Sequence, residues 1–237
     1  MTVITVHGIE KGEFCREMIW IKRDSDRIQN SMEIREMFGK GMTFDEYHGL
    51  FENMVKMGKT TAPLQPAKLV TATKLNFARS KRILKHIDTP EKYVAAMATV
   101  ESKMNWLLIV EPWCGDCANI VPMIANLSLL NPGIELRIFL RDQHPELTDQ
   151  YQTDGKKIIP KLVCFDEDFN QLGTWDGRPT VLQELVNAMK TNPAIDSDEL
   201  KKQVQLWYLK DLGTTFFREF CEKVIAWQPK ESVAEYC

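Results

Sequence analysis

The stretch WLLIVEPWCGDC, residues 106–117, constrains the fold of this chain more than any other. It begins with a continuous apolar run, as a β-strand that is buried on both faces requires. Two cysteines separated by two residues follow, and the helical sequence ANIVPMIANLSLL comes directly after them. We therefore expect Cys114 just past the end of a buried strand and Cys117 in the first turn of a helix.

Two cysteines at such a place can form a redox couple. The N–H groups of a first helical turn lack intrahelical partners, and the helix dipole adds about half a positive charge there. Both favour a thiolate at Cys114. A spacing of three residues lets the two sulfur atoms meet within one turn, so that Cys114 attacks or is attacked and Cys117 resolves. Asp116 opposes the thiolate by about 0.6–1.2 kcal/mol, which roughly cancels the dipole.

Two other interpretations of the pair are a metal site and simple packing. A metal site needs two or more further ligands at suitable spacing, but Cys164 and Cys221 stand alone and the four histidines are scattered. Packing does not explain a cysteine between Trp113 and Gly115 at a strand–helix turn. We therefore predict a dithiol and no metal, and no structural disulfides among the six cysteines: Cys15, Cys114, Cys117, Cys164, Cys221 and Cys237.

The composition is that of an ordinary globular protein, with 237 residues of which 44% are hydrophobic and 27% charged. The net charge of -3 argues against non-specific nucleic-acid binding, which needs a basic surface. No run approaches the roughly 18 apolar residues of a membrane span. The start of the sequence lacks the apolar core of a secretory signal, so we expect a cytoplasmic protein with no membrane partner.

The chain divides into four predicted segments. Residues 1–41 form an extension of uncertain structure. Residues 42–97 form a helical arm, whose first helix starts at a capping box of Thr43 and Glu46. Its second helix covers residues 67–86, and its third starts at Thr89-Pro90. Residues 98–191 form an α/β domain, and residues 192–237 form a C-terminal helix, interrupted near Gly213, with a tail.

Within the α/β segment, strands and helices alternate before a hairpin. We expect strands at residues 106–111 and 134–140, each followed by a helix. The sequences KLVCFDE and QLGTW, joined by DFN, predict a hairpin, and residues 180–190 predict an amphipathic helix. The order β-α-β-α-β-β-α predicts an α/β fold with a mixed central sheet and helices on both faces.

Taken together, residues 98–191 resemble the thioredoxin fold. The resemblance lies in WLLIVEPWCGDC with its following helix, and in Ile159-Pro160 before the next strand. In that family a Trp usually precedes the first cysteine, here Trp113. The proline that opens the third strand is cis and faces the dithiol, which implies this place for Pro160. The stretches KLNFARSKRI, FLRDQ, GTWDGRP and LWYLKD resemble a poorly characterised bacterial branch of thioredoxin-like proteins with a helical N-terminal arm.

The sequence departs from typical thioredoxins at two positions. The buried Asp that serves as proton acceptor, six residues before the first cysteine, is Leu108 here, and the usual Pro between the cysteines is Asp116. Glu111 and Asp116 are the nearby candidates for proton handling. The resemblance implies a thiol–disulfide oxidoreductase that uses the Cys114-Gly115-Asp116-Cys117 dithiol and no bound cofactor. Its partners would be a protein disulfide or a thiol reductant.

Four further positions are candidates for a substrate rim. Asn76, Arg79 and Arg82 share one helix face, which is either a polar stripe or a surface that borders the dithiol. Arg178 either reaches the same rim or caps a sheet edge. Two alternative functions remain open: a non-enzymatic thioredoxin-fold protein that binds, scaffolds or senses redox state, and a metal-carrying protein.

Overall fold

A computed structural model describes residues 30–228 of the chain. Most of the extension predicted over residues 1–41 lies outside the described residues, as do Cys15, Cys237 and most of the predicted tail. The chain divides into two units, residues 1–40 and 41–237. The sheet and the cysteine pair belong to the second unit.

The second unit is organised around a mixed sheet. Strand β1 (Met104–Val110) pairs in parallel with β2 (Ile134–Leu140) and antiparallel with β3 (Lys161–Phe165), which pairs antiparallel with β4 (Gln171–Asp176). The strand order is therefore β2-β1-β3-β4. Every residue of β1 except Asn105 is buried, because the strand is covered on both faces. The predicted mixed sheet is confirmed.

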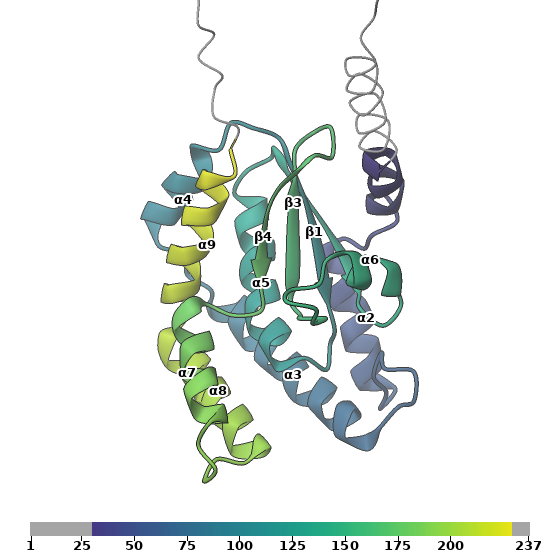
Figure 1. The fold of residues 1–237 in the computed structure, drawn as a ribbon, viewed down its shortest axis with the longest axis vertical. Coiled ribbons are helices and arrows are strands. Elements are labelled where there is room, and N and C mark those ends of the chain that lie inside the picture. Colours follow the sequence, from purple (N-terminus) through teal and green to yellow (C-terminus); the bar gives the residue numbers. More distant parts are fainter. Residues whose placement is uncertain (1–29, 229–237) are drawn as a thin grey trace, which may run out of the picture. The chain divides into compact units, whose positions relative to one another are not determined.

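Helices connect these strands in the predicted order. Helix α5 (Gly115–Leu129) follows β1, α6 (Pro145–Gln150) follows β2, and α7 (Thr180–Lys190) follows β4. Figure 1 shows α7 to the left of the sheet and α6 to its right, so both faces are covered. Helix α5 buries twelve of its fifteen residues, which makes it the central helix of the core. Its first turn lies at the carboxyl end of β1.

The predicted helical arm consists of α2 (Phe44–Lys56), α3 (Ala67–His86) and α4 (Glu91–Ala98). The capping box of Thr43 and Glu46 is present and begins α2, as the sequence predicts. Helix α3 has the predicted bounds. It packs against both α2 and α5, so one face of the arm lies near the first turn of α5.

Several boundaries differ from those predicted, and two of them lie at the start of an element. Helix α4 begins one residue later than expected, because its N-cap is Pro90 and not Thr89. The Thr89 hydroxyl instead accepts a hydrogen bond from Asn126 at 2.6 Å. Strand β1 begins two residues early, since its pairing with β2 starts at Met104 opposite Ile134.

Two helices end the described chain, α8 (Ser197–Asp211) and α9 (Thr214–Ala226). Leu212 and Gly213 between them adopt left-handed backbone angles, with φ of 52° and 83°, so the predicted interruption is confirmed. Phe220 of α9 packs edge-on against Trp106 of β1, with ring centroids 5.4 Å apart. Between residues 30 and 228, no helix has the length and apolar character needed to cross a membrane.

Candidate active site

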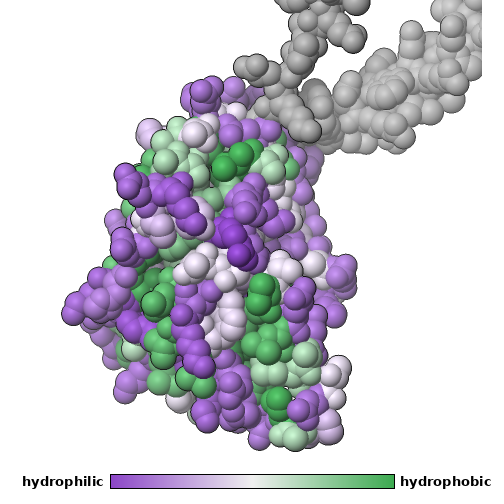
Figure 2. All heavy atoms as spheres, turned by 90° about the vertical axis from the view of Figure 1, so that its left-hand side faces the viewer, coloured by the Kyte–Doolittle hydropathy of each residue, from purple (hydrophilic) through white to green (hydrophobic). Residues whose placement is uncertain are grey.

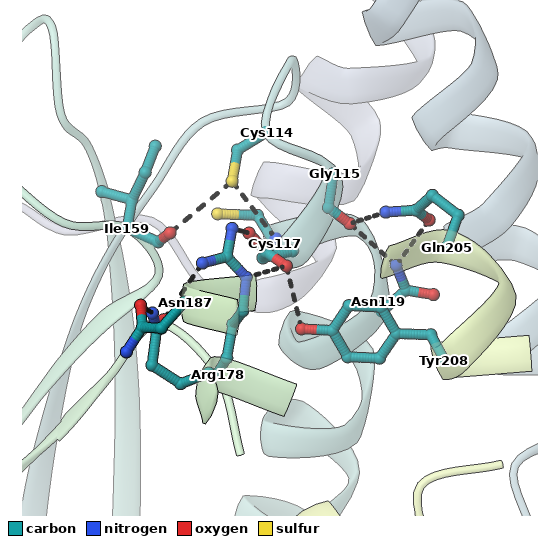
Figure 3. A network of polar contacts seen from close by, with 11 residues as sticks. Cys114, Gly115, Cys117, Asn119, Ile159, Arg178, Asn187, Gln205 and Tyr208 are labelled. Atoms are coloured by element: carbon teal, nitrogen blue, oxygen red, sulfur yellow. Dashed lines mark hydrogen bonds and ion pairs between the residues drawn. The ribbon is translucent and has the colours of Figure 1, made fainter. Parts of the chain in front are cut away.

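Cys114 and Cys117 meet at the first turn of α5. Cys114 is the N-cap residue, and its sulfur accepts a hydrogen bond from the Cys117 backbone N–H at 3.5 Å. The Cys114 side chain is partly exposed, whereas Cys117 is 1% exposed. Figure 3 shows the two side chains next to each other, and both are free thiols. One sulfur can therefore meet a partner from outside while the other lies behind it.

A cis peptide bond between Ile159 and Pro160 faces the first cysteine. The Cys114 thiol donates to the Ile159 carbonyl oxygen at 3.6 Å, as Figure 3 shows. Pro160 directly precedes β3. The prediction of a cis proline beside the dithiol is confirmed by these contacts.

Asp116, between the two cysteines, is held in a buried ion pair. Arg178 Nε and Nη2 donate to its two carboxylate oxygens at 3.0 and 2.6 Å, and the Tyr208 hydroxyl donates at 3.0 Å. Burial raises the pKa of the Asp116 carboxyl above its ordinary value, against the guanidinium and the hydroxyl, which favour the charged form. Burial opposes the charge on Arg178, but Asp116 raises the pKa of that guanidinium. The bidentate geometry is that of a charged pair.

This ion pair changes the expected effect of Asp116 on its neighbours. The sequence suggested a lone carboxylate that opposes a thiolate at Cys114. Arg178 supplies a compensating positive charge at the same place, so the opposition is weaker than a lone carboxylate would give. Of the two places predicted for Arg178, the structure supports the one beside the dithiol.

A second polar cluster fixes α8 over the first turn of α5. Gln205 donates to the Gly115 carbonyl at 3.3 Å and accepts from Asn119 at 3.0 Å, and Asn119 also donates to Gly115 at 2.7 Å (Figure 3). A side chain at Gly115 would meet the Gln205 amide at 2.9 Å. A larger residue between Cys114 and Asp116 would therefore displace the Gln205 amide from its hydrogen bond with the Gly115 carbonyl.

Glu111 lies buried on the β1 side of the dithiol. Its carboxylate accepts hydrogen bonds from the Thr61 hydroxyl and from the Asp142 backbone N–H, the latter at 2.9 Å. Burial raises the pKa of this carboxyl above its ordinary value of 4.5. Burial also raises the pKa of the Cys117 thiol well above its ordinary value, and the Glu111 backbone partly opposes that rise. Tyr47 of α2 is buried nearby. Burial raises the pKa of its hydroxyl, and negative charge on Cys117 or Glu111 raises it further.

A groove of about 920 Å³ leads to Cys114 between α3 and α8, and we call it the α3–α8 groove. Asn76, Arg79 and Arg82 line it together with Trp113 and Cys114. This helix face is therefore polar and also borders the dithiol, so each of its two interpretations agrees with part of the structure. Asn76 is buried and donates to the Pro112 carbonyl at 3.0 Å, which positions the loop before the dithiol. The two arginines lie along the groove.

Trp113 forms one wall of the opening to the dithiol. The Arg141 guanidinium lies 4.6 Å from the centroid of its ring, a cation–π contact. Arg141 also forms an ion pair with Asp142 at 2.8 Å. Because Asp142 donates its backbone N–H to Glu111, the wall and the buried carboxylate belong to one network.

Four residues at the site were not predicted from the sequence: Tyr47, Thr61, Gln205 and Tyr208. Each lies far from the cysteines in sequence. Tyr208 belongs to the LWYLKD stretch, but the resemblance of that stretch does not predict its contact with Asp116. Tyr47 is buried in α2, and nothing in its sequence neighbourhood indicates a place near the dithiol. The described residues contain no group of three His, Cys, Asp or Glu side chains that could hold a metal ion.

The mixed sheet, the dithiol at the N-terminus of α5 and the facing cis proline define a thioredoxin-like protein. The chain belongs to the thioredoxin family, because the family model described as thioredoxin matches residues 63–190. The match includes α3 as well as the sheet. A search of curated proteins finds no match to this sequence.

Two solved structures share the fold over most of the chain. A protein of unknown function from Pseudomonas aeruginosa is 21% identical, with a TM-score of 0.53, and the match covers 81% of this chain and 95% of that one. An HIV epitope scaffold is 20% identical, with a TM-score of 0.50 and the same coverage of both chains. These likenesses support the fold, and they cover more of the chain than the family match does.

Proposed function

We propose that this protein is a thiol–disulfide oxidoreductase that reduces or exchanges protein disulfides. The observation that carries the proposal is the pairing of a partly exposed Cys114 thiol, open to a groove, with a buried Cys117 thiol one turn behind it. A reversible dithiol needs one accessible attacking sulfur and one protected resolving sulfur. A cytoplasmic location is part of the proposal, because cytoplasmic reductants would return the pair to its dithiol form.

In the proposed reaction, the Cys114 thiolate attacks one sulfur of a substrate disulfide. A mixed disulfide forms, and the other substrate sulfur leaves as a thiolate. Cys117 then loses its proton and attacks the Cys114 sulfur. The Cys114–Cys117 disulfide forms, the second substrate thiolate leaves, and the substrate gains two electrons. An outside thiol reductant then restores the dithiol.

The proton on Cys117 needs an acceptor, because burial holds that thiol in its neutral form. Glu111 is the better of the two candidates. Burial raises the pKa of both carboxyls, but the Asp116 carboxylate is held in an ion pair by Arg178. The Glu111 carboxylate accepts hydrogen bonds from two neutral groups, and its backbone interacts with Cys117. A carboxylate with a raised pKa is a stronger base and so accepts a thiol proton more readily.

The test is a trapping experiment. In Cys117→Ser, the mixed disulfide on Cys114 has no resolving sulfur and should persist. The variant, expressed in its native cell and quenched with acid, should carry covalently bound proteins that a reducing gel releases. The variant without either cysteine is the matched control and should carry none. An empty trap, with Cys114 shown to be accessible to an alkylating reagent, would contradict the proposal.

The alternative is a thioredoxin-fold protein that binds partners or senses redox state without turnover. The observation in its favour is the groove, which offers a binding surface whether or not the dithiol reacts. Turnover of a model disulfide with an excess of thiol reductant separates the two functions. Repeated turnover supports the oxidoreductase, and a single stoichiometric oxidation supports the sensor.

A further inference from the structure

The α3–α8 groove is far more positive than the chain that contains it. Six cationic side chains line the groove against two carboxylates, Asp116 and Asp198, which gives the lining a charge of +4. The whole chain carries -3. The six cations are Lys68, Arg79, Arg82, Arg178, Lys201 and Lys202.

Two of these cations have no carboxylate partner among the described ion pairs. Lys68 and Lys201 share Asp198, Lys202 pairs with Glu199, and Arg178 pairs with Asp116. Arg79 donates only to the neutral amide of Asn76, at 2.7 Å. Arg82 lies close enough to Arg79 to lower its pKa, in addition to the larger effect of burial. Two neighbouring guanidinium groups near the dithiol therefore lack counter-charge within residues 30–228.

Aliphatic side chains lie between these charges. Leu75 of α3 and Leu209 of α8 both line the groove, and they are 53% and 44% exposed. Leu206, one turn earlier on α8, is 37% exposed. Figure 2 shows hydrophobic patches separated by hydrophilic bands on the neighbouring face, over α7 to α9. The groove thus offers apolar contact and positive charge together.

The spread of the charges matches an extended chain rather than one small anion. Lys68 and Arg82 are fourteen residues apart on α3, which at about 1.5 Å per residue is about 21 Å. An extended peptide covers this distance with about six residues. A partner segment with carboxylates at several positions and an aliphatic side chain between them complements the groove along its length.

We propose that the α3–α8 groove binds an acidic, aliphatic segment of a partner protein and presents the disulfide of that segment to Cys114. This inference deepens the proposed function and rests on it, because it names the class of disulfide that the dithiol receives. Arg79 and Arg82 would receive the carboxylates, and Leu75 and Leu209 would contact the aliphatic side chains.

The experiment uses three disulfide-linked peptides that differ only in their flanking residues, which are Glu and Leu, Gln and Leu, or Lys and Leu. The reduced full-length protein should reduce the Glu peptide with a kcat/KM at least about fivefold above that of the Lys peptide. High salt should shrink this ratio, since the contacts are solvent-exposed. Arg82→Glu should lower the ratio about fivefold or more. Lys74→Glu, with the same charge change on α3 outside the groove lining, should leave it nearly unchanged.

Binding is measured separately with the same peptides carrying Ser in place of Cys, by fluorescence anisotropy. A Glu preference in both binding and reduction supports the inference. Equal values for the three peptides, with turnover intact, would overturn the inference and leave the proposed function standing. An equal loss in Lys74→Glu and Arg82→Glu would also overturn it, because the effect would then be one of net charge. No reduction of any peptide would overturn the proposed function itself.

Discussion

Asp116 places a carboxylate in the first turn of α5, between the two cysteines for which we propose dithiol chemistry. The fold compensates this charge with Arg178, from the segment after β4, and with the Tyr208 hydroxyl from α8. Removing one partner of a buried pair leaves the other charge unpaired, which costs far more than the pair contributes when intact. The ion pair therefore ties three distant segments to the dithiol turn.

This residue-scale argument predicts the effect of Arg178→Gln. At neutral pH the free energy of unfolding should fall by roughly 2–4 kcal/mol, because the Asp116 carboxylate stays buried without its guanidinium. Without Arg178, the carboxyl of the folded protein holds its proton to higher pH than in the wild type. The loss should therefore be small near pH 4 and grow as the pH rises. Urea unfolding at pH 4 and pH 7 measures it.

The control for this prediction is the double variant Asp116→Asn with Arg178→Gln. It has no carboxyl at residue 116, so its loss relative to the wild type should vary less with pH than that of Arg178→Gln. A loss in Arg178→Gln that is the same at both pH values would show that Arg178 acts through packing and not through the charge of Asp116.

At the scale of elements, local patterns in the sequence predict most of the fold. Helices α3 and α7 and strand β2 have the predicted bounds, because helical periodicity and strand alternation are properties of neighbouring residues. The cysteine pair and the facing proline carry a motif, so they are also predictable. The contact of Tyr208 with Asp116 spans 92 positions and has no local signal. Such contacts depend on how α8 packs on α5, which periodicity does not determine.

Helix α8 forms one wall of the groove, and its stability should affect binding there. The Asp196 carboxylate caps α8 by accepting hydrogen bonds from the N–H groups of Asp198 and Glu199 at 2.9 and 2.8 Å. Asp196→Ala should lower the free energy of unfolding by about 1 kcal/mol and fray the first turn. It should also weaken binding of the acidic peptide. Hydrogen exchange at α8 and anisotropy titration measure the two effects.

Thr43→Ala provides a matched control, because Thr43 caps α2 through a similar side-chain contact and does not line the groove. It should cost about the same stability, roughly 1 kcal/mol, and leave peptide binding unchanged. Equal weakening of binding by both cap variants would mean that global stability, and not the α8 wall, sets the affinity.

At the scale of the whole molecule, one of the four cysteines that the structure describes is partly exposed and the other three are buried. Burial raises the pKa of Cys164 in β3 to about 12 and that of Cys221 in α9 to about 11. Burial also raises the pKa of Cys117. At pH 8, a thiol with a pKa of 11 to 12 is only about 10⁻³ to 10⁻⁴ thiolate, and the thiolate is the form that reacts. Cys114 is the partly exposed member of the four.

The last prediction follows from this separation. In the reduced, folded protein at pH 8, iodoacetamide should alkylate Cys114 first, and Cys164 and Cys221 should react only when the protein unfolds. Replacing Cys15 and Cys237 by Ser removes the two cysteines outside the described residues from the measurement. Mild oxidation of the same variant should give only the Cys114–Cys117 disulfide. Neither Cys164 nor Cys221 has another cysteine within four residues of it in the sequence. Peptide mass mapping at several times measures both the order of alkylation and the disulfide formed. Alkylation of Cys164 as fast as that of Cys114, or a dominant disulfide to Cys221, would show that the core opens more readily than this packing allows.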